Sequence, residues 1–337
     1  MRYLENNEKQ NIRPLYEKCF DDEKELVDYY FEKRLPDNFV AVNEKDGQIV
    51  SAMHLIPKRA IVGKYKTNVM YIYGVGTLEE YRKQGFMKEM FCQVINDLFT
   101  NMAAFTYLIP SDDTNAEIYK KYGFEFVMDK CGIKDEEVRK KPTHSLISRK
   151  VDNSDIVRLS IFAKSAIEKQ YNVSLSKDRK YFKQIIELTQ VEGGNVEIYV
   201  ENRVIVGYRI WIDDEIIEEV LDPSIQSMSW LNNEHKPYAM ARVLNIRTCL
   251  RLLDFKTFKK TVVRIFDPVI EENNGCFRMH YHHGSLKLDK IDEDKLIGEP
   301  DFDLTIGQLT AHIFGYKLIE GFPAVCESPS FFINDYM

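Results

Sequence analysis

The amino-acid sequence predicts a mixed α/β protein built from more than one domain. Short apolar runs alternate with segments whose apolar residues recur at helical spacing, which is the pattern of strands that alternate with helices. The chain has 337 residues, which is long for one ordinary domain and suits two or three. Hydrophobic residues make up 44% and charged residues 29% of the chain, a balance typical of globular proteins rather than disordered ones.

The first third alternates strands and helices. The strongest helical signal begins at Gly85, because Met87, Met90, Val94 and other apolar residues after it fall on one helical face. The turn at Asp46–Gly47 is typical of a connection between two strands. The predicted helices are Ile12–Phe20, Glu23–Lys33, Gly85–Thr100 and Asn115–Tyr122, and the predicted strands are Phe39–Asn43, Ile49–Val62, Val69–Leu78, Phe105–Ile109 and Phe124–Cys131.

Two breaks divide the rest of the chain. The first is a charged, proline-bearing linker at Lys134–Pro142, and the second is the Ser, Pro and Asn-rich stretch Asp222–Lys236. Between them we expect helices at Ser154–Gln170 and Ser176–Thr189 and strands at Asn195–Glu201, Val204–Ile212 and Ile216–Leu221. After them we expect strands at Ala241–Ile246, Thr261–Phe266, Cys276–His282 and Ser285–Leu288 and a helix near Thr305–Phe314. The last seven residues are apolar and aromatic, so we expect the tail to dock.

Charge and cysteine content narrow the class of protein. The net charge of −7 argues against a nucleic-acid partner and favours cationic substrates such as amines. No apolar run is long enough to cross a bilayer, and the N-terminus lacks an apolar signal region, so we expect no membrane association and no secretion. The six cysteines are scattered without a CxxC pair, which favours a reducing cytoplasm over a zinc or disulfide scaffold.

The most informative stretch runs from Val75 to Met87, where a strand ends and a charged loop leads into a helix at Gly85. A helix N-terminus offers unpaired backbone N–H groups and a positive dipole end, which together bind anions. Gly85 lets a phosphate approach the backbone, and Arg82 and Lys83 add positive charge. The stretch is neither a Walker loop nor GxGxxG. Alone, it is better explained by a capped amphipathic helix with solvated basic residues.

A second stretch, Asn115-Ala-Glu-Ile-Tyr119-Lys-Lys-Tyr-Gly123-Phe, follows the next predicted strand. Together the two stretches resemble the GNAT family of N-acetyltransferases, which carry an Arg/Gln-x-x-Gly-x-Gly/Ala pyrophosphate loop and an Asn-x-x-x-x-Tyr helix that runs into Tyr-Gly-Phe. Met87 departs from the pattern, because it stands where the family has a small residue. The resemblance implies a GNAT fold at the N-terminus and acetyl-CoA as the co-substrate.

The resemblance also implies roles for individual residues. Tyr119 would protonate the departing CoA thiolate, since a phenol is a proton donor with a pKa near 10; the alternative is a tyrosine that only packs in the core. The strand around Gly74 would supply a backbone N–H to the oxyanion that forms on the substrate. Asp22 would border the acceptor pocket, although helix capping by Asp21 or Asp22 is an equal alternative. The implied cofactor-binding residues are Val75, Thr77, Arg82, Lys83, Gly85, Phe86, Met87 and Asn115.

The remaining chain narrows the resemblance to the Eis (enhanced intracellular survival) type of bacterial acetyltransferase. The middle segment has a similar helix and strand content without an Arg-x-x-Gly loop, as in a degenerate second GNAT-like domain. Met240–Ile246 and Asp301–Ile306 resemble the sterol-carrier-protein-like α+β domain that ends these enzymes. The implied domains are residues 1–135, 143–232 and 237–337. An assembly of several copies is also implied.

The C-terminal carboxylate of Met337 is a further candidate, because in Eis-like enzymes this group reaches the active site. The tail carries no lysine or arginine to neutralise it, and an α-carboxylate is charged at neutral pH. It would orient a cationic amine or accept its proton. The alternative is a tail that only packs against the third domain.

Other residue patterns predict no site. His280, His282 and His283 fit a polar strand face near the turn at Gly284 better than a metal site, so we expect no metal. Cys92 fits a core thiol within a helix better than a nucleophile.

Taken together, the sequence predicts a cytoplasmic N-acetyltransferase in which a primary amine attacks acetyl-CoA directly within a ternary complex. The acceptor stays open between aminoglycosides, polyamines and lysine side chains. The rival interpretations are a non-catalytic acyl-CoA or lipid-binding protein that keeps the fold and a transferase for longer acyl chains.

Overall fold

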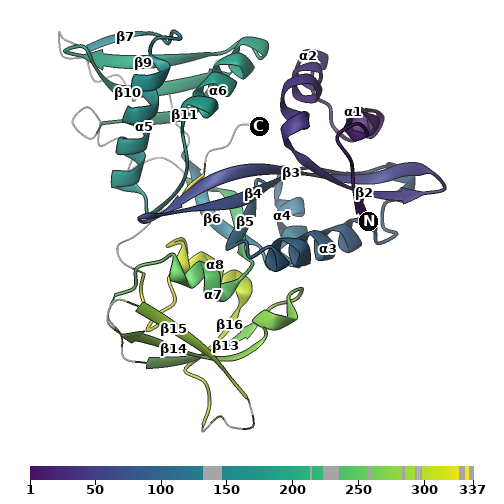
Figure 1. Cartoon of the computed structure of the whole chain (residues 1–337), viewed down its shortest axis with the longest axis vertical. Helices are drawn as coiled ribbons and strands as arrows, with labels where there is room; N and C mark the ends of the chain where they lie inside the picture. Colours follow the sequence, from purple (N-terminus) through teal and green to yellow (C-terminus); the bar gives the residue numbers. More distant parts are fainter. Residues whose placement is uncertain are drawn as a thin grey trace.

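The computed structural model describes residues 1–131, 146–212, 215–222, 235–256, 258, 260–282, 285–292, 294, 296, 298–325 and 331–333. Three sheets organise these residues, each with its own helices (Figure 1). The mixed α/β class predicted from the alternation of strands and helices is confirmed. The helices of the described residues are all too short or too polar to cross a membrane.

The largest sheet has the order β1-β2-β3-β4-β5-β12-β6, and β8 and β17 extend it beside β3. Its pairings are antiparallel except for β4 with β5 and β8 with β17. Its strands are β1 (Arg2–Tyr3), β2 (Phe39–Lys45), β3 (Gln48–Val62), β4 (Tyr65–Thr77), β5 (Phe105–Leu108), β6 (Glu125–Cys131), β8 (Val173–Leu175), β12 (His235–Val243) and β17 (Phe331–Phe332).

Helices cover both faces of this sheet because its strands alternate two sets of apolar side chains. Val40, Val42 and Ala52 pack toward α1 (Arg13–Cys19) and α2 (Lys24–Tyr29). Ala41 and Met53, which alternate with them, pack toward α3 (Phe86–Thr100) and α4 (Asp113–Lys120). Short helical turns lie at Lys9–Ile12, Tyr30–Arg34, Leu35–Asp37, Glu79–Tyr81 and Glu271–Asn273.

The middle unit, residues 146–222, has a four-stranded antiparallel sheet of order β11-β10-β9-β7. Its strands are β7 (Leu146–Lys150), β9 (Asn195–Glu201), β10 (Val204–Ile212) and β11 (Glu215–Leu221). The helices α5 (Ile156–Gln170) and α6 (Arg179–Val191) pack their apolar faces on this sheet around the buried Tyr208. The predicted linker 134–142 lies outside the described residues, which stop at residue 131 and resume at residue 146.

The last unit pairs a sheet of order β15-β14-β13-β16 with two helices. Its elements are α7 (Ile246–Arg251), β13 (Lys260–Phe266), β14 (Gly275–His282), β15 (Ser285–Ile291), β16 (Phe302–Thr305) and α8 (Ile306–Ile313). Helix α8 begins with a capping box in which Thr305 and Gln308 satisfy each other's backbone N–H groups.

One strand was assigned to the wrong part of the molecule. The sequence placed Ala241–Ile246 in the third domain, but β12 lies in the first sheet between β5 and β6. Ala239, Met240 and Ala241 are completely buried, so this strand needs partners on both edges, and these come from residues far away in the sequence. The division at residue 237 therefore cuts through a strand of the first sheet, and the three-domain division otherwise stays a prediction.

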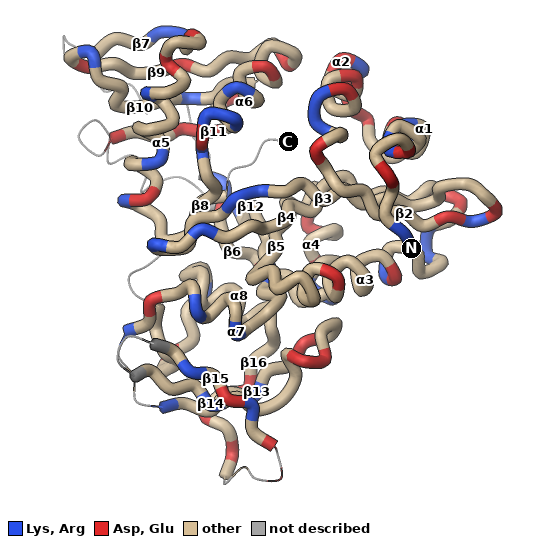
Figure 2. Tube along the Cα trace, viewed as in Figure 1, with Lys and Arg blue, Asp and Glu red and all other residues tan. Residues whose placement is uncertain are grey.

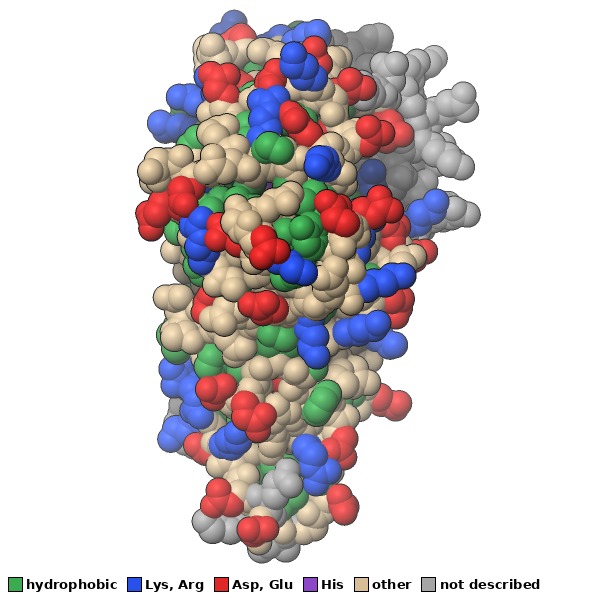
Figure 3. All heavy atoms as spheres, turned by 90° about the vertical axis from the view of Figure 1, so that its right-hand side faces the viewer, with side chains coloured by type: hydrophobic (Ala, Val, Ile, Leu, Met, Phe, Trp, Pro, Cys, Tyr) green, Lys and Arg blue, Asp and Glu red, His purple; other side chains and the backbone are tan. Residues whose placement is uncertain are grey.

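The charges are evenly mixed. Figure 2 shows Lys and Arg interspersed with Asp and Glu along all three parts of the chain. Figure 3 shows the same mixture, with apolar side chains between the charges, on the face toward α1 and the β2–β3 hairpin. Charge alone therefore marks no site on this face, and local geometry has to identify one.

Candidate active site

Strands β4 and β5 separate next to an irregularity in β4. Their parallel pairing covers Met70–Ile72 of β4, which then runs on to Thr77. On its other edge, β4 places Gly74 and Val75 opposite the single residue Met53 of β3, which is a β-bulge. A bulge takes backbone groups out of the ladder and leaves them for other partners. The end of β4 can therefore offer its backbone to a bound molecule.

Gly74 is needed at this bulge for two reasons. Its φ of +54° is a conformation that residues with a side chain rarely adopt, and a Cβ there would lie 3.1 Å from Cδ2 of His54. The sequence predicted an oxyanion contact from this part of the strand. The structure places Gly74 at the bulge, and its role stays a prediction.

The loop from Thr77 to Gly85 leads into helix α3. Lys83 and Gly85 have φ angles of +61° and +94°, so the loop contains two left-handed positions. Gly85 is the N-cap of α3, and no side chain caps the helix. Left-handed residues in such a loop turn successive N–H groups toward one concave side, which favours an anion. Arg82 donates from Nε to the carbonyl oxygen of Thr77 at 3.1 Å, which ties the loop to the end of β4.

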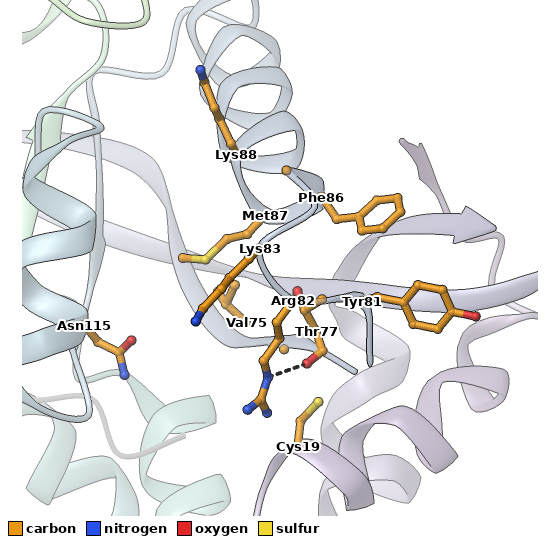
Figure 4. Close-up of a pocket in the computed structure, with 12 residues that line it drawn as sticks. Cys19, Val75, Thr77, Tyr81, Arg82, Lys83, Phe86, Met87, Lys88 and Asn115 are labelled. Atoms are coloured by element: carbon orange, nitrogen blue, oxygen red, sulfur yellow. Dashed lines mark hydrogen bonds between the residues drawn. The ribbon is translucent and has the colours of Figure 1, made fainter. Parts of the chain in front are cut away.

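The loop, the end of β4 and helix α4 enclose a cavity of about 570 Å³ (Figure 4). Lys83 and Asn115 point toward each other from opposite sides of it, whereas the rings of Tyr81 and Phe86 point away (Figure 4). A Cβ built on Gly85 meets nothing within 4 Å, so the space in front of the helix start is open. All eight residues predicted to bind the cofactor line this cavity: Val75, Thr77, Arg82, Lys83, Gly85, Phe86, Met87 and Asn115.

Four other residues also line the cavity: Cys19, Gly76, Tyr81 and Lys88. Lys88 lies in the first turn of α3, and its side chain runs along the helix away from Lys83 and Asn115 (Figure 4). Cys19 comes from α1 and lies against Gly76, where a Cβ would be 3.0 Å from its Sγ atom. No local pattern predicts that contact, because it depends on the packing of α1 on the sheet.

Helix α4 fixes the orientation of Asn115. Asp112 caps the helix and accepts the backbone N–H of Asn115 at 2.8 Å, and the Asn115 amide donates to Ser111 and Asp112 at 2.7 and 2.9 Å. Tyr119 lies one turn later on the same helical face. It is half-buried beside Phe91, with 5.5 Å between ring centroids, and it is not one of the residues that line the cavity.

The chemical state of Tyr119 follows from its surroundings. Burial raises the pKa of the Tyr119 phenol to about 12, and the carboxylate of Asp112 acts in the same direction. The phenol is therefore protonated at neutral pH, which is the state that a proton donor needs.

The Tyr122-Gly123-Phe124 segment connects this region to the end of the chain. Gly123 has a φ of +83°, and a Cβ there would lie 2.7 Å from the guanidinium of Arg242. Arg242 donates to the carbonyl oxygen of the half-buried Tyr122 and to both oxygens of Asp267, at 2.7 and 2.8 Å to the latter, and the side chains of Arg242 and Asp267 are completely buried. Gly123 therefore leaves room for Arg242 of β12, within the first sheet, and for Ile306 of α8, whose Cγ2 would lie 2.6 Å from a Cβ.

The alternative role of Asp22, capping a helix, is wrong. The N-cap of α2 is Glu23, whose side chain makes no capping hydrogen bond. Instead the exposed Asp22 carboxylate accepts a hydrogen bond of 2.7 Å from the hydroxyl of the buried Tyr16. Tyr16 is also 2.9 Å from the hydroxyl of Tyr73, which directly precedes the bulge.

Met337 lies outside the described residues, as do the neighbouring residues from 334 onward. The part of the tail that is described is docked: Phe331 and Phe332 pair with β8, and Ile333 is 1% exposed and donates its N–H to Sδ of Met128 at 3.3 Å. His283 also lies outside the described residues. In the rest of the chain that the structure covers, no group of three or more His, Cys, Asp or Glu side chains is placed to hold a metal ion.

Comparison with known proteins places two of the three parts. Residues 1–127 match the family model described as an acetyltransferase (GNAT) domain, and residues 244–322 match the one described as a sterol carrier protein domain. The second match begins directly after β12. No curated protein matches the chain by sequence.

Solved structures resemble the chain over nearly its whole length. A probable N-acyltransferase from Enterococcus faecalis is 18% identical with a TM-score of 0.77, covering 94% of this chain and 90% of its own. A GCN5-related N-acetyltransferase from Kribbella flavida is 14% identical with a TM-score of 0.73 over 100% and 98%. Eis1 from Mycobacterium abscessus is 9% identical with a TM-score of 0.68 over 94% and 90%. The chain thus carries a GNAT acetyltransferase domain and a sterol carrier protein domain in an Eis-like fold, as its motifs predicted.

Proposed function

We propose that this chain, whose first 127 residues are a GNAT acetyltransferase domain, transfers an acetyl group from acetyl-CoA to a primary amine. One observation carries the proposal. The residues that the family motif assigns to the cofactor come from two separate stretches of sequence, and all of them line one cavity. A degenerate domain with a structural role alone would have no need to keep that set together.

The cavity suits the pyrophosphate of acetyl-CoA. The start of α3 has no side-chain cap, and open space lies in front of Gly85. Arg82 and Lys83 bring positive charge to this wall. The backbone N–H groups of Gly85, Phe86 and Met87 would hold the phosphate oxygens, since a helix start favours negative charge.

The other residues would position the reacting groups. Val75 and Thr77 would pair their backbone groups with the pantetheine arm, as an added strand does, and Asn115 would contact it from α4. The bulge at Gly74 would supply a backbone N–H to the oxyanion. Tyr119 would donate its proton to the CoA sulfur as the carbon–sulfur bond breaks. Asp22 would border the acceptor pocket, and the carboxylate of Met337 would orient the cationic amine.

Acetyl-CoA supplies the activated acyl group, so the chain needs no nucleophile of its own. Holding the thioester and the amine in one site converts a bimolecular reaction into an intramolecular one. The acceptor class, an assembly of several copies and a cytoplasmic location stay part of the proposal.

The test is CoA release when the full-length protein is mixed with acetyl-CoA and a panel of amines: an aminoglycoside, a polyamine and a lysine peptide. We expect release with at least one of them and micromolar to millimolar binding of acetyl-CoA by calorimetry. Binding of acetyl-CoA without CoA release in the presence of any of the amines would favour a non-catalytic acyl-CoA-binding protein. Faster release from longer acyl-CoAs would favour the longer-chain transferase.

A further inference from the structure

A chain of hydrogen bonds runs from the bulge in β4 to the surface. Its inner end is Tyr73, its middle is Tyr16 on α1, and its outer end is Asp22. The Tyr16 hydroxyl is 2.9 Å from the Tyr73 hydroxyl and 2.7 Å from Oδ2 of Asp22. Tyr16 is 1% exposed, Tyr73 is half-buried and Asp22 is exposed to solvent. Three side chains from β4, α1 and the α1–α2 loop therefore connect the edge of the proposed active site to water.

The hydrogens of this chain all point outward. A carboxylate only accepts hydrogen bonds, so the single hydroxyl hydrogen of Tyr16 goes to Asp22. The Tyr16 oxygen must then accept the hydrogen of Tyr73. In this order Tyr73 is the donor to Tyr16, and a phenol oxygen that donates its hydrogen can still accept one.

A neutral histidine lies beneath the chain and does not compete for a proton. Asn38 donates to the hydroxyl of Tyr30 at 3.2 Å, and the same hydroxyl shares a hydrogen bond of 2.6 Å with Nδ1 of His54. Burial lowers the pKa of His54 to about 3, so the ring is neutral at physiological pH. The rings of Tyr30 and His54 pack on Tyr16, with centroids at 5.6 and 5.7 Å. They hold Tyr16 in place and leave Asp22 as the proton acceptor.

The inner end of the chain lies beside the proposed cofactor cavity. Tyr73 is followed directly by the bulge residues Gly74 and Val75, and Val75 lines the cavity. On α1, Cys19 lies about one turn after Tyr16 and lines the same cavity. The chain therefore starts at the end of β4 where the amine and the thioester would meet.

We propose that Tyr73, Tyr16 and Asp22 form a relay that carries the proton released by the acceptor amine to solvent. This inference rests on the proposed function. The amine nitrogen forms a bond to the acyl carbon, and one N–H proton passes to the oxygen of Tyr73. Tyr73 gives its hydrogen to Tyr16, and Tyr16 gives its hydrogen to Asp22, which releases a proton to water. The carbon–sulfur bond breaks, and the sulfur takes the proton of Tyr119, which is replaced from solvent.

In this scheme Tyr73 is the catalytic residue and Tyr16 acts through it. Burial and the neighbouring Tyr73 raise the pKa of Tyr16 far above its ordinary value, so a lasting Tyr16 phenolate is unfavourable. The protons therefore move together along the chain, and no charged phenolate intermediate forms. Movement of several protons in one step has a signature in heavy water that a merely structural tyrosine lacks.

The experiment compares the full-length protein with its Tyr16→Phe variant. The variant keeps the ring and breaks the relay, so we expect kcat at saturating substrates to fall roughly 100-fold, the lower end of the range for proton-transfer catalysis. Acetyl-CoA affinity should not change. The rate of the wild-type protein should depend on the deuterium fraction of the solvent along a curve, and that of the variant along a straight line. Tyr208→Phe is the matched control, since Tyr208 is a buried phenol that donates to Glu218 at 2.6 Å in the middle unit.

Asp22→Asn is the second variant, because the asparagine oxygen still accepts the Tyr16 hydrogen bond but takes no proton. We expect a loss of kcat similar to that of Tyr16→Phe, and this variant decides the question if Tyr16→Phe does not fold. An unchanged kcat with unchanged deuterium dependence would overturn the relay alone. An increase of the amine KM at constant kcat in Asp22→Asn would also overturn it, since Asp22 would then only bind the amine. If none of the amines in the panel caused the wild-type protein to release CoA, the proposed function would be overturned, and the relay with it.

Discussion

Helix α3 begins very differently from α5 and α6, although all three pack on sheets in the same way. Helix α3 in the first unit begins at Gly85, whose φ is +94° and which gives the helix no side-chain cap. Helix α6 in the middle unit begins at Asp178, whose carboxylate accepts the backbone N–H of Tyr181. Helix α5 begins at Asp155, a buried carboxylate bound to Arg149 and Arg158. The N-termini of helices α5 and α6 in the middle unit already have a carboxylate beside them, so we call this unit closed. The N-terminus of α3 is free to bind the negative charge of a ligand.

The sheets beneath these helices differ in the same sense. In the first unit β4 pairs with β5 only over Met70–Ile72 and then continues past a bulge. In the middle unit β9 and β10 stay paired from Val204 to Trp211, with a single shift in register. A cofactor that adds itself to a strand needs the first arrangement. A similar layering of helices on a sheet therefore gives an active site only where the strands separate and the helix start is left open.

The prediction with the largest effect concerns Tyr119. It tests whether the first unit, called the open unit because the start of α3 is uncapped, performs the acyl transfer by itself. Tyr119→Phe should lower kcat roughly 10²- to 10⁴-fold, the usual loss for a general acid, with little change in acetyl-CoA affinity. Since the pKa of Tyr119 is raised to about 12, the acid form persists across the physiological range, and activity limited by this group should fall only as the pH rises toward 12. Steady-state kinetics between pH 6 and 10 should show the loss of kcat in the variant and, in the wild-type protein, no fall that is due to Tyr119.

The matched control is Tyr122→Phe, near the end of the same helix. Tyr122 is half-buried and stacks on Phe91 with centroids 4.7 Å apart, so the variant perturbs the same core. Near-normal turnover in Tyr119→Phe, or an equal loss in both variants, would mean that Tyr119 only packs in the core.

The second prediction converts the open helix start into a closed one like that of α6. Gly85→Asp should weaken acetyl-CoA binding at least about 100-fold, because its carboxylate would stand where the pyrophosphate is proposed to bind. Gly85→Asn is the control, since it has the same shape and the same strain at positive φ but no charge. A calorimetric titration of both variants isolates the charge. Equal affinity of the aspartate and asparagine variants, with both folded, would remove the pyrophosphate from this position.

Local patterns predicted residues that line one cavity, because these residues lie in short stretches of sequence. Gly85 at a helix start, with basic residues before it, can be recognised within a few positions of sequence. The same holds for Asn115 and Tyr119, which are one helical turn apart. The left-handed φ of Lys83 gave no such signal, because a lysine in that conformation is held there by the folded loop.

The features that the sequence did not predict all depend on contacts between distant residues. The position of β12 in the first sheet depends on pairing with β5 and β6, which no periodicity within β12 reveals. The relay joins Tyr16, Tyr73 and Asp22 from three elements, and each of them alone looks like an ordinary aromatic or surface residue. The strand β8 (Val173–Leu175) is too short for a periodic pattern, and it depends on pairing with β3 and β17, which are far away in the sequence.

The third prediction concerns the end of the chain, whose carboxylate is proposed to orient the amine in the active site of the open unit. A short C-terminal tag, or deletion of Asp335–Met337, should lower kcat at least about tenfold, because the amine would lose an orienting carboxylate. Acetyl-CoA affinity should change far less. An N-terminal tag is the control: it disturbs the ion pair of 3.0 Å between the Met1 ammonium and the exposed Glu89, and such surface pairs contribute at most about 1 kcal/mol. Equal turnover of the two tagged proteins would exclude the terminal carboxylate from the chemistry.

The last prediction has the smallest effect and tests the closed helix start of the middle unit. Asp155 accepts hydrogen bonds of 2.6 and 2.8 Å from Arg149, one of 2.7 Å from Arg158 and one of 3.1 Å from the N–H of Asp152. The hydrogen bonds from Arg149 are the main reason why the pKa of Asp155 is lowered to about 2. Asp155→Asn should therefore reduce the free energy of unfolding by about 1 kcal/mol at pH 7 without changing acetyl-CoA affinity.

The pH dependence gives the sign of this effect. The carboxyl has a pKa near 3.9 in the unfolded chain and a lower one in the folded protein, so the unfolded state binds more protons between these two values. The stabilisation by Asp155 is then complete above about pH 5 and is lost as the pH falls toward 2. Urea unfolding of the two proteins at pH 7 and at pH 3 should show a gap that narrows in acid. A constant gap would assign the loss to packing, and weaker acetyl-CoA binding in the variant would couple the closed unit to the open one.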